Sequence, residues 1–159
     1  MMIFINQAKK NILNLLLNGG IYLTNMEVKI YIFAQEHILD NLALYQDQID
    51  EKLVDEPTQI MVQLTIAESI MVNSGKLLAD AKYWLNEAMH SETINTLKQL
   101  TKENKLITST AVNQIIKSLC KDQQYLVDWC ERLNRSSTHR ADYCRSIISK
   151  HKAEMQNRI

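Results

Sequence analysis

Apolar residues recur every three or four positions along most of this chain, a spacing that is typical of amphipathic α-helices. The most regular stripe steps by four and three throughout, and its members are Ile60, Leu64, Ala67, Met71, Ser74, Leu78, Ala81, Leu85 and Ala88. A repeat of about 3.5 residues with small side chains at alternate positions favours close, coiled-coil-like packing against a neighbouring helix. The stripe therefore predicts a helix at residues 58–89. A second stripe runs from Val28 to Leu53, with one polar interruption at Gln35, and predicts a helix at residues 27–54.

The breaks between stripes predict an all-α fold, a bundle of long antiparallel helices. Residues 55–57, Asp-Glu-Pro, separate the first two helices, because proline suits a first helical turn and acidic side chains complement the helix dipole there. Ser91 is a good N-cap and predicts a short helix at 91–102. The hydroxyl-rich segment 134–138 divides the remainder into helices at 109–134 and 137–157. We expect two helical hairpins, 27–54 with 58–89 and 109–134 with 137–157, linked by the short helix.

Three glycines and one proline leave little material for long turns, so the connections should be short. Gly75 lies inside the predicted helix 58–89, where glycine costs about 1 kcal/mol relative to alanine. The favoured interpretation is a close helix crossing that only glycine permits, and the alternative is a functional kink.

The length of 159 residues predicts one helical-bundle domain at residues 26–159. Residues 1–25 form an N-terminal extension. One interpretation is that they are not native, because Asn18-Gly19-Gly20 can be encoded by a purine-rich stretch that resembles a ribosome-binding site upstream of Met26. The other is that they are native and weakly ordered. The apolar run 12–17 is too short to span a bilayer, so no membrane partner is expected. Three cysteines without close pairing favour a reducing compartment, the cytoplasm.

The charges are segregated although the chain as a whole is neutral. Counting Lys and Arg against Asp and Glu gives +2 for residues 1–25, −8 for 26–93, +2 for 94–128 and +4 for 129–159. All five arginines lie in the last segment. Such asymmetry indicates an anionic partner or a complementary subunit.

Side chains suited to binding are densest between residues 129 and 145. The candidate binding residues are Trp129, Arg132, Arg135, His139, Arg140, Tyr143 and Arg145. Arginines beside aromatic side chains can clamp phosphates and stack on bases. A turn at 134–138 would add free backbone N–H groups at the start of the last helix, where anions bind. The alternative is that these arginines pair with the acidic segment 26–93, within one chain or across an oligomer.

No motif for catalysis, a metal or a cofactor is evident, so we expect a protein that is not an enzyme. The four histidines lack the spacing of metal ligands. Cys130, His139 and Cys144 would form a three-ligand site only if the turn at 134–138 brought them together; two packed thiols and an exposed histidine are the alternative. The carboxylates around Asp47 and Asp55 are typical of a solvated acidic surface.

The sequence W-C-E-R-L-N-R at 129–135 and T-H-R-A-D-Y-C-R-S-I-I-S-K at 138–150 resembles small helical proteins of phages and mobile elements of gut bacteria. The resemblance covers about the C-terminal third and implies a genomic context, without a mechanism. Together with the charge pattern it predicts a binding protein whose C-terminal hairpin contacts an anionic partner, nucleic acid first. The alternatives are a self-associating or protein-binding module, with acidic helices against the basic hairpin, and a protein that sequesters a nucleotide.

Overall fold

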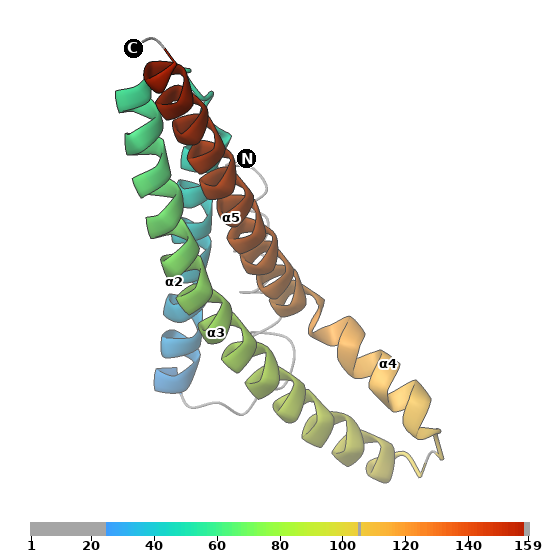
Figure 1. Ribbon diagram of the computed structural model, residues 1–159. Coiled ribbons are helices and arrows are strands. Elements are labelled where there is room, and N and C mark those ends of the chain that lie inside the picture. Colours follow the sequence, from blue (N-terminus) through green and yellow to red (C-terminus); the bar gives the residue numbers. More distant parts are fainter. Residues whose placement is uncertain (1–24, 105, 158–159) are drawn as a thin grey trace. The chain divides into compact units, whose positions relative to one another are not determined.

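The computed structural model describes residues 25–104 and 106–157, and within them the fold is all-α (Figure 1). The helices are α2 (Asn25–Asp50), α3 (Pro57–Lys102), α4 (Ser109–Leu119) and α5 (Lys121–Gln156). No strand occurs in the described residues, and none of their helices is long and apolar enough to cross a membrane. Residues 1–24, which carry most of the predicted N-terminal extension, lie outside the described residues.

The start of α3 follows the sequence prediction closely. Pro57 is its first residue, and the carboxylate of Glu56 accepts hydrogen bonds from the backbone N–H groups of Thr58 and Gln59, at 3.1 and 2.8 Å. These two donors hold the pKa of Glu56 below its ordinary value, the bond from Gln59 having the larger effect. A proline without a free N–H and an acidic cap together satisfy the unpaired donors of the first turn.

The predicted separate helix at 91–102 is wrong, because α3 continues through Ser91 without a break. Nothing between residues 88 and 93 removes a backbone hydrogen bond, since the segment has neither glycine nor proline. The hydroxyl of Thr93 donates to the carbonyl of Met89 at 2.7 Å and so stays inside the helix. A good N-cap residue starts a helix only where the backbone before it has left the helical conformation. The helix ends instead at Lys102, two residues before Asn104, which adopts the left-handed φ of 49°.

The predicted break at 134–138 is also wrong, and with it the hairpin of 109–134 with 137–157. The hydroxyls of Ser137 and Thr138 both donate to the carbonyl of Asn134, at 2.8 and 2.9 Å, and α5 runs through the segment. The break lies at Cys120, between α4 and α5. Its φ and ψ of −95° and 17° lie in the bridge region, outside the helical range, but its N–H still donates to the carbonyl of Ile116. Such a small irregularity leaves no mark on the hydrophobic stripe.

The helices divide between two compact units. One unit contains the described residues 25–39 and 79–128, and the other contains 40–78 and 129–157. All nine positions of the regular stripe in α3 are buried or half-buried, as the pattern predicts. The apolar core of the first unit includes Ile38, Leu39, Leu85, Ile116, Leu126 and Val127, and that of the second includes Leu42, Ile60, Ile70, Cys130, Leu133 and Cys144.

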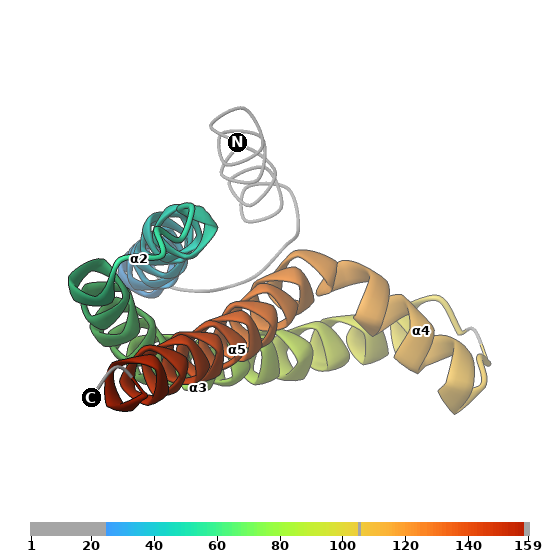
Figure 2. The same ribbon diagram turned by 45° about the horizontal axis from the view of Figure 1, so that its top comes forward.

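The second unit packs segments of α2, α3 and α5 side by side (Figures 1 and 2). The side-chain amide of Asn134 donates to the carbonyl of Met71 at 2.7 Å and to the hydroxyl of Ser74 at 3.0 Å. Further along α5, Arg140 contacts Gln63, which lies earlier in α3 than Met71 and Ser74. The two segments therefore run antiparallel, and the buried Ser74 in the apolar stripe is explained by its partner Asn134.

The interpretation of Gly75 as a close helix crossing is not supported by its surroundings. Gly75 is exposed, and a Cβ atom added there would meet the side-chain nitrogen of Asn134 at 3.8 Å, an ordinary van der Waals distance. α3 runs through Gly75 without a break. Alanine would fit this position.

Candidate anion-binding site

All seven predicted binding residues lie on one helix, α5, in the second unit. The sequence prediction placed them around a turn, and the continuous helix removes that geometry. Backbone N–H groups at 137–140 are inside the helix and donate to its own carbonyls, so they cannot hold an anion. Whatever α5 binds must be contacted by its side chains.

Arg140 is used within the fold. Its guanidinium donates to the backbone carbonyls of Ile49 and Glu51, at the C-terminal end of α2 and just beyond it, and to the side-chain oxygen of Gln63 at 3.0 Å. The amide of Gln63 in turn donates to the carboxylate of Glu51 at 3.3 Å. A cation at the end of a helix satisfies unpaired carbonyls and interacts favourably with the helix dipole. Arg140 therefore fastens the link between α2 and α3.

Arg145 and Trp129 are used within the fold as well. The two guanidinium nitrogens of Arg145 pair with Glu68 of α3 and Asp142 of α5, each at 2.8 Å, and these bonds raise the pKa of Arg145. The indole N–H of Trp129 donates to the side-chain oxygen of Gln46 at 3.3 Å. The alternative of arginines that pair with the acidic segment within one chain thus holds for Arg145, whereas Arg140 contacts carbonyls of that segment.

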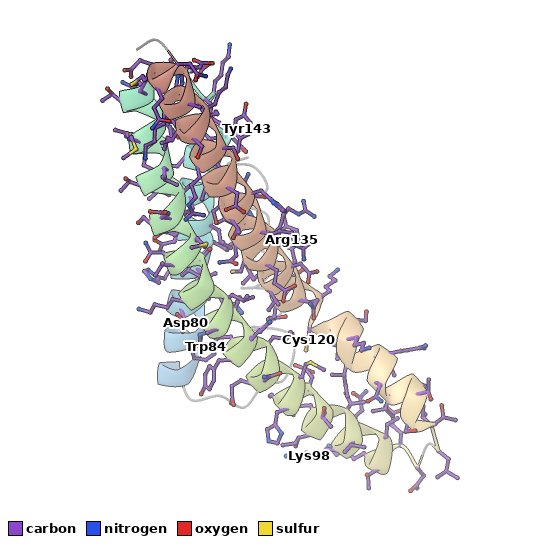
Figure 3. All side chains as sticks on the ribbon, viewed as in Figure 1. Asp80, Trp84, Lys98, Cys120, Arg135 and Tyr143 are labelled. Carbon is purple, nitrogen blue, oxygen red and sulfur yellow. The ribbon has the colours of Figure 1, made fainter. Side chains whose placement is uncertain are left out.

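Four of the predicted residues are exposed without a side-chain partner, and they share one face of α5. Arg132, Arg135, His139 and Tyr143 follow one another at steps of three and four residues, and all are exposed. They span about 16 Å at the helical rise of roughly 1.5 Å per residue. None of their side chains has a hydrogen bond or ion pair with another residue of the described chain. Figure 3 shows Arg135 and Tyr143 on the outer side of α5. We call these four residues the outer α5 face.

A shallow hollow adjoins the outer α5 face at Tyr143. It has a volume of about 340 Å³ and is lined by Leu53, Asp55, Ile60, Tyr143, Ser146, Ile147 and Lys150. Lys150 was not among the predicted binding residues, although it lies seven positions, two helical turns, after Tyr143. His151 was not among the predicted binding residues either, and its ring nitrogen lies 2.9 Å from the carboxylate of Asp55. No arginine lines the hollow.

The residues considered for a metal site do not converge. Cys130 and Cys144 are buried and not joined by a disulfide bond, and His139 is exposed. Burial raises the pKa of Cys144, while the nearby Arg140 lowers it. Within the described residues, no three His, Cys, Asp or Glu side chains are placed to hold a metal ion.

Comparison with known proteins gives no relative. No protein-family model, curated protein or solved structure matches the chain. The resemblance to helical proteins of phages and mobile elements stays a prediction.

Proposed function

We propose that the protein is a non-enzymatic helical binding protein, of the type found in phages and mobile elements, whose outer α5 face contacts the phosphates of a nucleic acid. The observation that carries the proposal is the difference among the arginines. Arg140 and Arg145 have partners within the chain, whereas Arg132 and Arg135 are exposed without one. Tyr143 on the same face offers a ring for stacking on an unpaired base.

The size of the face limits what it can do. Two guanidinium groups neutralise about two phosphates, so the logarithm of the affinity for duplex DNA should fall with the logarithm of salt concentration at a slope near −1.8. The affinity for duplex DNA should therefore fall roughly tenfold between about 50 and 200 mM salt. Contacts of this number support weak binding without sequence preference.

The test is a titration of fluorescently labelled single-stranded and duplex DNA, followed by anisotropy at several salt concentrations. Replacing Arg132 and Arg135 together by alanine should weaken binding and reduce the magnitude of the salt slope by about 1.8. The matched control replaces Lys76 and Lys152, two exposed lysines elsewhere in the same unit, and changes the net charge equally. Equal effects of the two double variants, or no binding by the wild type at low salt, would contradict the proposal.

A second candidate function, self-association, is favoured by the outer side of α3. Every exposed residue from Pro57 to Gly75 is uncharged, and Met61, Val62 and Val72 among them are large and apolar. Charged residues are depleted from the centres of protein interfaces, so an uncharged stretch of surface helix suits a protein partner. In the original form of this alternative, acidic helices of one copy contact basic residues of another. Arg140 and Arg145 are less available for such a contact, because both already have partners within the chain.

Light scattering over a range of protein and salt concentrations separates these possibilities. Self-association through the uncharged side of α3 should persist in high salt and be lost when Val72 is replaced by aspartate. Met155→Asp, another exposed apolar position, is the control. A monomer at every concentration would exclude self-association. An oligomer that dissociates as salt rises would favour the charge-based contact instead. The hollow beside Tyr143 contains no arginine and therefore gives the nucleotide-sequestering alternative no support.

A further inference from the structure

The first unit contains a two-helix arm that exposes large apolar side chains. The arm consists of the last turns of α3, the segment 103–108 and α4, and its two helices lie side by side (Figures 1 and 2). Its exposed large apolar residues are Ile94, Leu97, Leu106, Ile107, Ile115 and Leu119. Leu106, in the connection between the helices, is fully exposed. A single exposed leucine is normal on a protein surface, but several large apolar side chains exposed on one small arm indicate an interaction site.

Lysines surround these apolar side chains. Residues 94–121 contain five lysines, no arginine and Glu103 as the single acidic residue, a net charge of +4. Lys98 and Lys102 near the end of α3, and Lys117 and Lys121 beyond the connection, are exposed. Figure 3 labels Lys98 close to the end of α3. The partner must therefore be anionic and must also accept apolar side chains.

We propose that the end of this arm docks on the surface of an anionic lipid bilayer. Leu106 and Ile107 enter the boundary between headgroups and acyl chains, and Lys98 and Lys102 lie against lipid phosphates. Such surface docking needs no membrane-spanning helix, and it goes beyond the nucleic-acid contact proposed for α5. The sequence-based expectation of no membrane partner rested on the lack of a spanning segment and did not address this surface.

The placement of the apolar residues favours a bilayer over a partner helix. Leu106 and Ile107 lie in the connection, beyond the ends of both helices, where a partner helix laid along α3 and α4 would not cover them. A bilayer surrounds an inserted tip on all sides.

Charge and apolar contact are both needed. One weak anchor gives marginal membrane binding, and stable attachment combines an apolar anchor with a basic patch. Nucleic acid would accept the lysines but gives no apolar layer for Leu106. A second copy of the arm would place one +4 surface against another and is disfavoured by repulsion.

The experiment measures sedimentation of the full chain with vesicles of phosphatidylcholine and phosphatidylglycerol, and with vesicles of phosphatidylcholine alone. We expect binding to the anionic vesicles that weakens with salt. Leu106→Ser should reduce the partition coefficient roughly 10- to 100-fold. Replacing Lys98 and Lys102 by alanine should reduce it by about fivefold each at low salt. Leu106 is fully exposed, so its substitution leaves the fold intact, which circular dichroism checks.

Matched controls come from the second unit. Leu44→Ser removes an exposed leucine, and the Lys76 and Lys152 pair removes two exposed lysines. Insertion has its own readout: the extra emission of Leu106→Trp should be quenched by brominated lipid. The proposal is overturned if Leu106→Ser and Leu44→Ser bind alike, if both kinds of vesicle bind equally, or if the brominated lipid does not quench. Binding of poly-glutamate that depends on Leu106, with no vesicle binding, would also overturn it and would indicate an acidic protein partner.

Discussion

Replacement of Arg140 by methionine tests whether one side chain of α5 fastens the link between α2 and α3. Methionine keeps the apolar stem and removes the guanidinium, which donates to the carbonyls of Ile49 and Glu51 and to Gln63. A hydrogen bond from a charged donor contributes about 1.5–3 kcal/mol net. Glu51 is exposed and its carbonyl can be hydrated instead, whereas the side chain of Ile49 is buried. Counting one bond in full, and the dipole contact at about 0.3–1 kcal/mol, gives a loss of roughly 2–4 kcal/mol in the free energy of unfolding.

Urea denaturation followed by circular dichroism at pH 7 measures this loss. With an m-value of about 2 kcal/mol/M, the midpoint should fall by roughly 1–2 M. Arg132→Met is the matched control, since the same atoms are removed from an exposed residue without a partner, and it should change the stability by less than about 0.5 kcal/mol. The urea midpoint of Arg140→Lys should lie between those of Arg140→Met and Arg132→Met, because one ammonium group cannot reproduce all the hydrogen bonds of a planar guanidinium. Equal midpoints for Arg140→Met and Arg132→Met would refute the reasoning.

Four further predictions concern Gly75 and Glu92 of α3, Glu56 just before it, and Cys120 at the α4–α5 junction. Gly75→Ala should stabilise the protein by about 0.5–1 kcal/mol in urea denaturation, because its Cβ would meet only Asn134 at 3.8 Å; a loss of stability would mean that the helices approach more closely. Ionisation of Glu56 and ionisation of Glu92 should have opposite effects on the free energy of unfolding. The lowered pKa of Glu56 adds stability that is present above pH 4.5 and lost as the pH falls below it, so Glu56→Gln should destabilise at pH 7 and much less near pH 3.5. Burial raises the pKa of Glu92, so its ionisation costs stability as the pH rises above 4.5, and Glu92→Gln should raise the urea midpoint at pH 7 but not at pH 4. Burial, and then the charge of Glu92, raise the pKa of Cys120 to about 11, so only about one thiol in a thousand is ionised at pH 8. Iodoacetamide should therefore label Cys120 far more slowly in the native protein than in urea. Equal labelling rates in the two states would contradict this.

The helical content and the start of α3 could be predicted from the sequence, because they depend on interactions a few residues apart. Three glycines and one proline cannot interrupt helices often, and Pro57 with the carboxylate of Glu56 forms a start signal within four residues. The stripe from Ile60 to Ala88 also predicted which side of α3 is buried, since its period matches the helix. Each of these features is local, and the helix geometry is the same wherever the helix lies.

The helix ends inside the second half of the chain could not be predicted in the same way. Ser91 and the hydroxyls at 137 and 138 have the side chains of a cap, but a hydroxyl can bond either a free N–H or a carbonyl one turn earlier. In Ser137 and Thr138 it bonds the carbonyl of Asn134, and Asn134 itself is held by Met71 and Ser74 of α3. The tertiary contact supports the continuous helix, and nothing in the local sequence reveals it.

The division of the arginines was likewise decided by the tertiary structure alone. Five arginines in one stretch look equivalent in the sequence, and their charge predicts an attraction to acids without saying which acid. Antiparallel packing of α5 on α3 brings Glu68 to Arg145, 77 positions away, and the end of α2 to Arg140. Arg132 and Arg135 are on the side of α5 that the packing leaves open. The sequence determined that the segment 129–159 is basic, and the fold decided which of its arginines pair within the chain, because pairing depends on distances in space that separation along the chain does not set.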